Sequence, residues 1–580
     1  MTSLSIDYKV VSNRNNTSYI FSGKENIELD KQTLSNKLFN DDLINYDKEL
    51  NMLNIKYSPV RVCQYIPGVL VLKNNKTYGR ISVKGKLLYK CVPNDNKLPC
   101  FLIPYEMKHI GFSKVFINIY ITFQFKEWNV NDNYPLGIIT QNIGSVDILN
   151  NFYEYQLYCK SLNFSIQKFN KDVIKYSHLK SDSKILKKEI FEKYPSIEDR
   201  TNQSIYKIFS IDPIGCSDFD DAFSISQLGE NKYKISIYIS NVPLWIDFLE
   251  LWESFSSRVS TIYLPDKKRS MMPSILSDCL CSLQENQNRL AFVMDTIFYL
   301  DVNKKLQIEN ITYSNVLINI YKNYSYEEQT LLLDENYILL FETTKNISRQ
   351  YKYLSIKNSH DLVAYLMVFM NHHTAKEMQK NNTGIFRSVQ IKEQEGEKEH
   401  DVVPEDIEDF VKIWNSSSGN YVEIKEGVNI SHELLKMDSY IHITSPIRRI
   451  VDLLNIIKFQ ENKFGILSQN ANTFYNKWVT ELDFINLSIK SIRKIQNECS
   501  LLHLCCTDAE VMNEIYIGYV FDKLERNDGL IQYMVVIPKL KMISKIITRE
   551  NNKNYSQHKF KLYLFSNEEN FKKKIRLEQI

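Results

Sequence analysis

Residues 210–222 read S-I-D-P-I-G-C-S-D-F-D-D-A, and this stretch indicates both the fold and the chemistry of the chain. Its apolar start predicts a strand that ends at Asp212, and the proline and glycine that follow predict a tight turn. Three more aspartates, Asp218, Asp220 and Asp221, then come within four residues. Four carboxylates this close repel one another when all are ionised, and bound cations relieve that repulsion. The stretch therefore predicts a cation site at the end of a strand.

Carboxylate oxygens select hard cations, of which Mg²⁺ is the expected one here and Mn²⁺ a possible substitute. Two such ions can hold a phosphodiester between them, because one generates hydroxide from water and the other stabilises the leaving 3′ oxygen. An acidic surface turn is the alternative. An EF-hand calcium loop fits poorly, since its glycine and distal glutamate are missing, and a haloacid-type phosphatase would need a D-x-D directly after the strand. On these residues alone, two Mg²⁺ ions at the aspartates and an acidic surface turn both stay open.

A second informative stretch, residues 440–454, reads Y-I-H-I-T-S-P-I-R-R-I-V-D-L-L. Ser445 is a suitable N-cap and Pro446 suits the first helical position, so the pattern predicts a helix that starts here. The free backbone N–H groups at a helix N-terminus favour a phosphate. Arg448 would lie in that first turn and would add a planar, permanently charged donor group.

Two neighbouring side chains extend this hypothesis. Arg448 and Asp452 are four residues apart and would share a helix face, so Asp452 could orient the guanidinium. Arg449 would point elsewhere and hold either the aspartate cluster or another phosphate. The alternative is an N-capped helix with surface arginines. Beside four aspartates, we favour phosphate binding by Arg448.

The composition is that of a globular protein with several domains. The 580 residues suggest two to four domains, and 43% hydrophobic with 24% charged residues is ordinary. No apolar run approaches the roughly 20 residues that span a bilayer, and residues 1–8 do not resemble a secretory signal. We therefore expect no membrane partner and an intracellular, cytoplasmic location. Ten cysteines without a C-x-x-C pair argue against zinc and against a disulfide framework.

Charge is distributed unevenly although the net charge is only +3. Residues 160–193 contain nine lysines and four acidic residues, and residues 539–576 contain eleven lysines and arginines and three glutamates. These segments could be ordinary solvated faces. Basic segments on both sides of a neutral centre also suit a polyanion that crosses the molecule.

The pattern along the chain changes from β to mixed α and β, and then back to β. Residues 115–125 alternate apolar and polar, which predicts a half-buried strand with an open face of aromatic and amide side chains. A helical stretch is expected near residues 34–50. The expected fold class is α+β multidomain, with a mixed α/β catalytic centre between β-barrels. Other expected strands cover residues 205–211, 234–242, 515–521, 533–537 and 560–565, and other expected helices cover residues 362–378, 448–458 and 478–504.

The aspartate stretch resembles the nuclease signature of the RNase II/RNase R (RNB) family, with all four aspartates at the family spacing. Asp199-Arg200, upstream of the strand, is similar to that family as well. The resemblance extends across residues 195–505. Further blocks follow in the family's order, namely Tyr263-Leu264-Pro265, Met272-Pro273, residues 276–283, His432 and residues 444–449.

The resemblance implies a metal-dependent 3′→5′ exoribonuclease, a hydrolase that degrades single-stranded RNA to nucleoside 5′-monophosphates with two Mg²⁺ ions. RNA would enter a buried channel with its 3′ end first. Arg448 would stabilise charge on the scissile phosphate. Tyr263 would stack on a base near the 3′ end, although a core tyrosine is the alternative. The metal-binding catalytic residues would be Asp212, Asp218, Asp220 and Asp221. The other RNA-binding residues would be Ser445, Arg449 and Asp452.

Residues 134–144 resemble the second cold-shock barrel of the catalytic subunit of the eukaryotic exosome. The organisation is thus most similar to that subunit without its endonuclease domain. The catalytic unit is expected to be monomeric and could act in a larger RNA-processing complex. The expected domains are an N-terminal extension or truncated first cold-shock barrel (1–55), a cold-shock-like OB barrel (56–165), a basic linker (166–197), the RNB exoribonuclease domain (198–506) and a C-terminal OB-like RNA-binding barrel (512–580).

Two other functions stay open. A catalytically silent RNA-binding homologue would keep the fold, although it would have no need of four repelling aspartates. The sequence departs from the family pattern at residues 240–242, at Ile450 and near residues 364–365. These departures put the strength of substrate binding and the processivity in question more than the chemistry. A DNA exonuclease that uses the same metals is the third possibility, and contacts to the 2′-hydroxyl would distinguish RNA from DNA.

Overall fold

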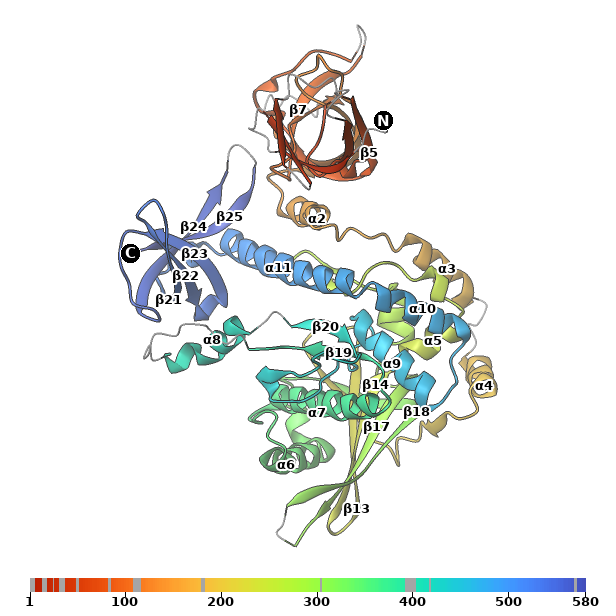
Figure 1. The fold of residues 1–580 in the computed structure, drawn as a ribbon. Coiled ribbons are helices and arrows are strands. Elements are labelled where there is room, and N and C mark those ends of the chain that lie inside the picture. The colour runs from red at the N-terminus through yellow and green to blue at the C-terminus, as the bar shows by residue number, and fades with distance from the viewer. Residues whose placement is uncertain are drawn as a thin grey trace. The chain divides into compact units, whose positions relative to one another are not determined.

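The structure is a computed structural model (Figure 1). Its chain divides into two compact units. We call Met1–Asn163, Leu264–Asp266 and Lys494–Ile580 the barrel unit, and Phe164–Tyr263 and Lys267–Arg493 the central unit. The described residues are 6–12, 18–23, 26–30, 37–47, 52–81, 85–107, 116–178, 183–302, 305–391, 403–416, 419–567 and 571–580.

The barrel unit begins with a five-stranded antiparallel sheet in the order β3-β2-β1-β4-β5. The helix expected near residues 34–50 is wrong for the described part of that stretch, because Leu43–Asp47 forms strand β4. Ile44 and Tyr46 are buried there and alternate with more exposed neighbours, which is the period of a strand. The other strands are β1 (Ile6–Val11), β2 (Ser18–Ser22), β3 (Ile27–Asp30) and β5 (Met52–Tyr57).

The next five strands close into a barrel in the order β10-β8-β7-β6-β9. Its core contains Tyr89, Phe101 and Phe123. The elements are helix α1 (Pro59–Val62), strands β6 (Ile66–Leu70), β7 (Leu87–Pro93), β8 (Phe101–Tyr105), β9 (Ile119–Glu127) and β10 (Leu136–Ser145), and helix α2 (Leu149–Cys159).

Strand β9 differs from the half-buried strand expected at residues 115–125. Residues 119–123 are all buried, so the predicted open face is wrong for this part of the strand, whereas Val115 lies outside the described residues. Helix α2 contacts β9, and the rings of Tyr120 and Tyr155 stack with their centroids 4.3 Å apart. The outer face of β9 is therefore covered by a helix that the alternating pattern did not reveal.

The C-terminal part of the barrel unit is a five-stranded antiparallel sheet in the order β23-β22-β21-β24-β25. Its core contains Val520, Tyr533 and Phe560. Strands are present at all three places expected from the sequence. The elements are α12 (Ala509–Asn513), β21 (Tyr516–Glu525), β22 (Ile531–Ile537), β23 (Met542–Thr548), β24 (Gln557–Ser566) and β25 (Lys573–Gln579).

The central unit is built on a six-stranded sheet in the order β11-β18-β12-β13-β14-β17, in which β17 also pairs with β18. Strand β12 (Ile208–Asp212) runs parallel to β18 (Leu306–Ser325) and antiparallel to β13 (Asp221–Gly229). The end of β12 therefore lies at the same edge as the start of β13. The remaining strands are β11 (Glu198–Arg200), β14 (Lys232–Ser240) and β17 (Asn288–Leu300), and two small ladders pair β15 (Ile262–Tyr263) with β16 (Lys268–Arg269) and β19 (Ile385–Ser388) with β20 (Asn420–Glu423).

Helices cover this sheet. Tyr365 and Phe369 of α7 (Ser359–Lys380) belong to one apolar cluster with Ile237 and Phe292 of the sheet. Asn358 caps α7 by accepting the Asp361 backbone N–H at 3.0 Å. The other helices are α5 (Val242–Phe248), α6 (Glu335–Gln350), α8 (Glu408–Asn415), α9 (Ile450–Lys463), α10 (Gln469–Thr480) and α11 (Leu482–Thr507).

The segment expected to be a basic linker, residues 166–197, is largely helical. It contains α3 (Gln167–His178) and α4 (Ser183–Lys193), and Phe169 and Val173 of α3 are buried. Apolar residues four apart gave α3 a buried face that its high lysine content obscured in the sequence.

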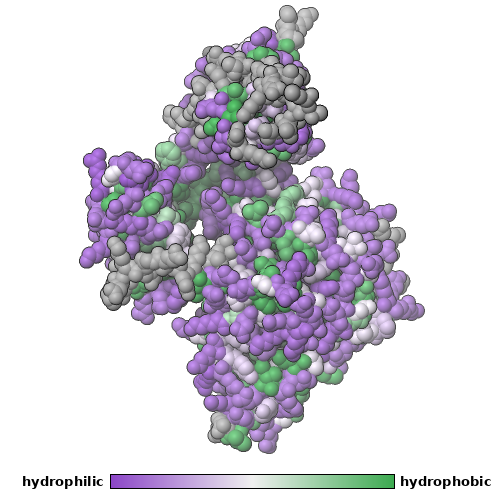
Figure 2. Space-filling view, viewed as in Figure 1, coloured by the Kyte–Doolittle hydropathy of each residue, from purple (hydrophilic) through white to green (hydrophobic). Residues whose placement is uncertain are grey.

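The visible surface is mostly hydrophilic, with scattered apolar side chains (Figure 2). Among the helices of the described residues, none is both long and apolar enough to cross a membrane.

Candidate active site

The four aspartates lie at one edge of the central sheet. Asp212 is the last residue of β12 and Asp221 is the first residue of β13, so two carboxylates are fixed by neighbouring strands. The backbone between them makes a turn in which Gly215 has a φ of +79°, a conformation that glycine adopts without strain. The turn then brings Asp218 and Asp220 back toward the same edge.

Asp220 is 2% exposed and joins the aspartate stretch to the arginine stretch. Its Oδ1 accepts the backbone N–H of Ile447 at 2.9 Å, and its Oδ2 accepts Nε of Arg448 at 2.9 Å. Nη2 of Arg448 also donates to Oγ of Ser445 at 3.1 Å. The guanidinium is therefore held from two sides, and its position relative to the aspartates is fixed.

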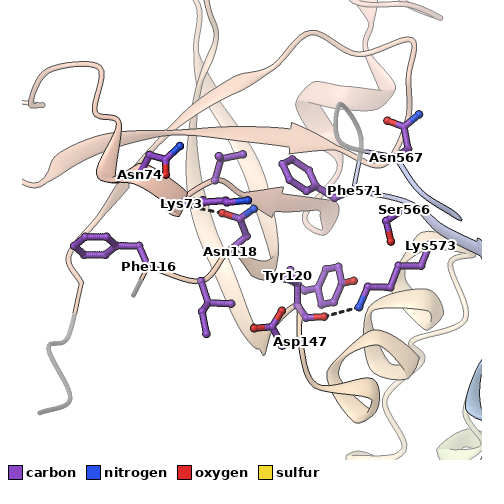
Figure 3. Close-up of a pocket in the computed structure, with 13 residues that line it drawn as sticks. Lys73, Asn74, Phe116, Asn118, Tyr120, Asp147, Ser566, Asn567, Phe571 and Lys573 are labelled. Carbon is purple, nitrogen blue, oxygen red and sulfur yellow. Dashed lines mark hydrogen bonds between the residues drawn. The ribbon is translucent and has the colours of Figure 1, made fainter. Parts of the chain in front are cut away.

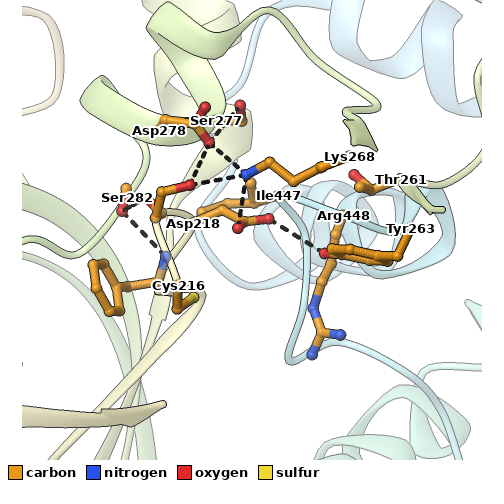
Figure 4. A network of polar contacts seen from close by, with 12 residues as sticks. Cys216, Asp218, Thr261, Tyr263, Lys268, Ser277, Asp278, Ser282, Ile447 and Arg448 are labelled. Carbon is orange, nitrogen blue, oxygen red and sulfur yellow. Dashed lines mark hydrogen bonds and ion pairs between the residues drawn. The ribbon is translucent and has the colours of Figure 1, made fainter. Parts of the chain in front are cut away.

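Both oxygens of Asp218 are also occupied. Nζ of Lys268 lies 2.9 Å from Oδ1, and the hydroxyl of Tyr263 donates to Oδ2 at 3.4 Å (Figure 4). The same ammonium lies 2.9 Å from Oδ1 of Asp278. Burial alone would lower the pKa of Lys268, but its hydrogen bonds to Asp278 and Asp218 more than offset this effect and raise it.

Asp212 and Asp221 differ from the other two aspartates, because each has a buried Oδ2 atom without a hydrogen-bond partner. Burial raises the pKa of Asp212 to about 6. Burial, together with repulsion from Asp212 and Asp220, raises the pKa of Asp221 well above its ordinary value. Burial also raises the pKa of Asp220 to about 7, against the opposing effect of Arg448. Such carboxylates need positive charge to stay ionised.

This donor set fits a divalent cation. Unpartnered, buried carboxylate oxygens are hard ligands, and a bound cation would supply the compensation that the protein does not give them. Within the described residues, however, no three His, Cys, Asp or Glu side chains converge into a ready-made metal site. In this structure Lys268 contacts Asp218 and Arg448 contacts Asp220.

The arginine stretch differs from the expectation in its local structure. Helix α9 begins at Ile450 with Arg449 at the N-cap position, so Ser445 is not the N-cap and Arg448 is not in the first helical turn. The backbone of this stretch pairs with residues 259–261 instead: N–H of Thr261 donates to the carbonyl of Arg448 at 3.0 Å, and N–H of Ile450 donates to the carbonyl of Val259 at 2.9 Å. These bonds hold residues 446–448 in a turn before the helix.

The expected partners of Asp452 are also corrected. Asp452 pairs with Arg449, whose Nη2 lies 2.9 Å from its Oδ1, and it does not orient Arg448. The same oxygen accepts the backbone N–H of Ser445 at 2.8 Å. Asp452 is fully buried, so this pair fixes the turn that carries Arg448. In this structure Arg449 thus binds a carboxylate of the protein itself. Its predicted contact with a phosphate stays a prediction.

Comparison with known proteins adds independent information on this geometry. Residues 200–340 match the family described as the RNB domain. This segment of the chain is thus similar to the RNB domain. Residues 88–154 match the Dis3-like cold-shock domain 2. The resemblance to the RNase II/RNase R family and the α+β fold class with an OB-type barrel are thereby confirmed. The four aspartates and Tyr263 lie inside the matched RNB segment, whereas Arg448 lies beyond it.

Named relatives share only part of their length with this chain. The probable exosome complex exonuclease RRP44 of Caenorhabditis elegans is 30% identical over 129 residues, which are 22% of this chain and 13% of that protein. For the first three curated relatives, the match spans 13% to 23% of their length. The RNB domain therefore relates the chain to exoribonucleases, which are hydrolases of RNA.

Solved structures share the fold over almost the whole chain. Mycoplasma genitalium RNase R in complex with ribose-methylated single-stranded RNA aligns with a TM-score of 0.66 at 15% identity, over 99% of this chain and 97% of that one. Yeast Ssd1, a pseudonuclease, aligns with a TM-score of 0.57 at 13% identity, over 96% of this chain and 80% of that one. Because one of the two is a pseudonuclease, a shared fold does not decide whether RNA is cut.

Three residues of the matched segment contact the site although no sequence pattern assigned them a role. Lys268 and Asp278 contact the aspartate cluster or its partners, and Tyr326 donates its backbone N–H to the carbonyl of Asp212 at 3.1 Å. The ring of Tyr326 stacks on His360 with centroids 3.7 Å apart. Lys268 lies close to Tyr263 in the sequence. The sequence alone, however, does not predict that these two residues pair across two short strands.

The barrel unit contains a separate cavity of about 940 Å³ (Figure 3). Lys73 and Phe116 line it from the closed barrel, and Phe571 and Lys573 line it from the C-terminal sheet. Nζ of Lys573 donates to the carbonyl of Val146 at 3.0 Å. Cations beside aromatic rings are the side chains that bind single strands of nucleic acid, so this cavity is a candidate RNA contact outside the RNB domain.

Proposed function

We propose that the chain is a 3′→5′ exoribonuclease that hydrolyses single-stranded RNA to nucleoside 5′-monophosphates with two divalent cations, Mg²⁺ or in its place Mn²⁺. The observation that carries the proposal is the pair of buried, unpartnered oxygens on Asp212 and Asp221, beside Asp218, Asp220 and the fixed guanidinium of Arg448. A fold without chemistry would gain nothing from burying two uncompensated carboxylates, because each lowers its stability.

The residues divide the work between holding cations and holding phosphate. Asp212 and Asp221 offer free oxygens as ligands, and Asp218 and Asp220 would contribute once they exchange a protein cation for a metal. Bound Mg²⁺ would polarise the scissile phosphate and activate the attacking water. Asp220 and Ser445 hold Nε and Nη2 of Arg448, which leaves Nη1 to donate to a phosphate oxygen as negative charge develops on it.

The proposed partner is single-stranded RNA that enters with its 3′ end first. The proposed state is a monomeric catalytic unit, which could also act within a larger RNA-processing complex. Lysines at the cavity of the barrel unit would contact the RNA backbone, and such contacts weaken as the salt concentration rises.

A catalytically silent RNA-binding homologue is the second candidate. It is favoured by one observation, that no three carboxylates converge as a metal site within the described residues. It is opposed by the burial of Asp220 and Asp221 and by the unpartnered Oδ2 atoms of Asp212 and Asp221, for which such a homologue has no use.

The test is degradation of a 5′-labelled single-stranded RNA by the full chain, beside single-stranded DNA of the same sequence. With Mg²⁺ we expect a ladder that shortens from the 3′ end with release of nucleoside monophosphates, little change in the DNA, and no reaction in EDTA. If the protein binds the RNA but does not cut it with either Mg²⁺ or Mn²⁺, the chain is a catalytically silent RNA-binding homologue. Equal degradation of DNA would show a different substrate class.

A second expected result concerns Tyr263, which is 42% exposed on β15. Tyr263→Ala should raise KM for single-stranded RNA by about 5- to 150-fold, because stacking of one base on an aromatic ring contributes roughly 1–3 kcal/mol. Tyr263→Phe is the matched control, since it keeps the ring and removes only the hydroxyl on Asp218. Equal KM values for wild type and Tyr263→Ala would rule out a stacking role.

A further inference from the structure

A short hairpin delivers two side chains to Asp218. Strands β15 and β16 pair antiparallel with Tyr263 directly opposite Lys268. The hydroxyl of Tyr263 reaches Oδ2 of Asp218, and the ammonium of Lys268 reaches Oδ1. Opposite residues in such a pair project to the same face of the ladder, so one hairpin occupies both oxygens of one aspartate.

The ammonium of Lys268 has three acceptors for its three N–H groups. It lies 3.0 Å from Oγ of Ser217, 2.9 Å from Oδ1 of Asp218 and 2.9 Å from Oδ1 of Asp278 (Figure 4). Its side chain is 24% exposed, and those of Asp218 and Asp278 are 9% and 26% exposed. An amine in this setting is fully satisfied and partly shielded from solvent, which distinguishes it from a surface lysine.

Asp278 provides the ammonium with a second carboxylate outside the aspartate quartet. It lies on η3 (Ile275–Leu280), a π-helical turn, and Oγ of Ser217 and Oγ of Ser277 also approach its Oδ1 at 3.3 and 3.2 Å. Single π-helical turns occur frequently at functional sites. The lysine is thus shared between a carboxylate of the quartet and one beside it.

We propose that Lys268 is a built-in competitor of the divalent cation at Asp218, and that Asp278 holds its ammonium when the cation binds. This inference rests on the proposed function, since it assumes that Asp218 is a metal ligand. An ammonium 2.9 Å from Oδ1 of Asp218 and a metal ion on the same carboxylate would place two positive charges close together, and these charges repel each other. Lys268 is therefore a positioning residue that sets the affinity of the weaker of the two cations. The first cation would bind at Asp212 and Asp221, whose Oδ2 atoms have no hydrogen-bond partner.

The test measures Mn²⁺ binding by electron paramagnetic resonance, on the full chain without RNA, so that no readout depends on turnover. Lys268→Met keeps the length of the side chain and removes its charge. We expect it to tighten the weaker Mn²⁺ site by about tenfold, a typical coupling between two ligands that exclude each other. Lys267→Met is the matched control, because Lys267 is the exposed neighbour with the same charge, and it should leave both sites unchanged.

Asp278→Asn provides a second variant whose expected effect has the opposite sign. It removes the alternative carboxylate, so the ammonium stays on Asp218 and the weaker Mn²⁺ site should weaken several-fold. Binding by Lys268→Met no tighter than by Lys267→Met would overturn the competition, and so would an Asp278→Asn variant with the same or tighter binding than wild type. No Mn²⁺ binding by wild type or any variant would refute the proposed two-cation function as well. If two Mn²⁺ sites of unequal affinity are found and neither substitution changes these affinities, only the proposed role of Lys268 is refuted.

Discussion

Asp221→Asn is expected to reduce RNA hydrolysis by about 10³-fold or more, the scale of several kcal/mol of lost charge stabilisation at a metal. Asp221 is 8% exposed, and its Oδ2 has no donor within the protein. Asparagine keeps the shape of the side chain and removes the charge that would hold a cation. The rate of a single turnover on 5′-labelled RNA, at saturating enzyme and Mg²⁺, measures this effect directly.

The same substitution should not weaken the fold. The pKa of Asp221 is raised well above its ordinary value by burial and by repulsion from Asp212 and Asp220, so its charged form is unfavourable without a cation. We therefore expect the melting temperature of the metal-free Asp221→Asn variant to equal or exceed that of wild type. Asp409→Asn, at an exposed carboxylate of α8, serves as the control for both measurements. Activity above a tenth of wild type would contradict the assignment of Asp221 as a metal ligand.

Arg448→Met is expected to lower kcat by about 10²- to 10³-fold, as the loss of one preorganised donor does at other charged transition states. Asp220 and Ser445 already hold the guanidinium in place, so it loses little conformational entropy when it binds the phosphate. Arg448→Lys should recover only part of kcat, because an ammonium keeps the charge and loses the planar fork. Steady-state kinetics that separate kcat from KM would measure this.

Loss of Arg448 also leaves Asp220 without its ion pair, so a lower melting temperature is expected for Arg448→Met. The double variant Arg448→Met with Asp220→Asn removes the uncompensated carboxylate. It should regain stability and remain inactive, which separates the two roles of the arginine. An unchanged kcat in Arg448→Met at full folding would exclude contact with the scissile phosphate.

The local sequence predicted the aspartate edge well, because its signals are local. Asp212 at a strand end and Asp221 nine residues later are linked by a short turn whose proline and glycine are visible in the sequence. Contacts between distant segments were different. Asp220 and Arg448 are 228 residues apart, and no local pattern predicts their contact; the complementary chemistry of the two stretches and the resemblance to a family placed them in one site.

Other expectations failed where tertiary structure overrode a local pattern. A serine and a proline predicted a helix start at Ser445, but hydrogen bonds from residues 259–261 delay the helix to Ile450. An alternating strand predicted an open face at Tyr120, but α2 covers it. Lys268 gave no signal of its own, since its role depends on the register of a hairpin with two residues per strand.

The two halves of the aspartate site differ in how firmly the backbone holds them. Asp212 and Asp221 are anchored in the ladder of a sheet whose strands β17 and β18 run for 13 and 20 residues, so their oxygens are presented without further ordering of the chain. Asp218 lies in the connecting turn and is tied to a hairpin of two residues per strand. Short ladders open at low free energy, whereas long, buried ones exchange their amides only on global unfolding. Under the proposed function, we expect the stiff half to define where a phosphate is cut and the compliant half to adjust to each nucleotide as the RNA advances by one.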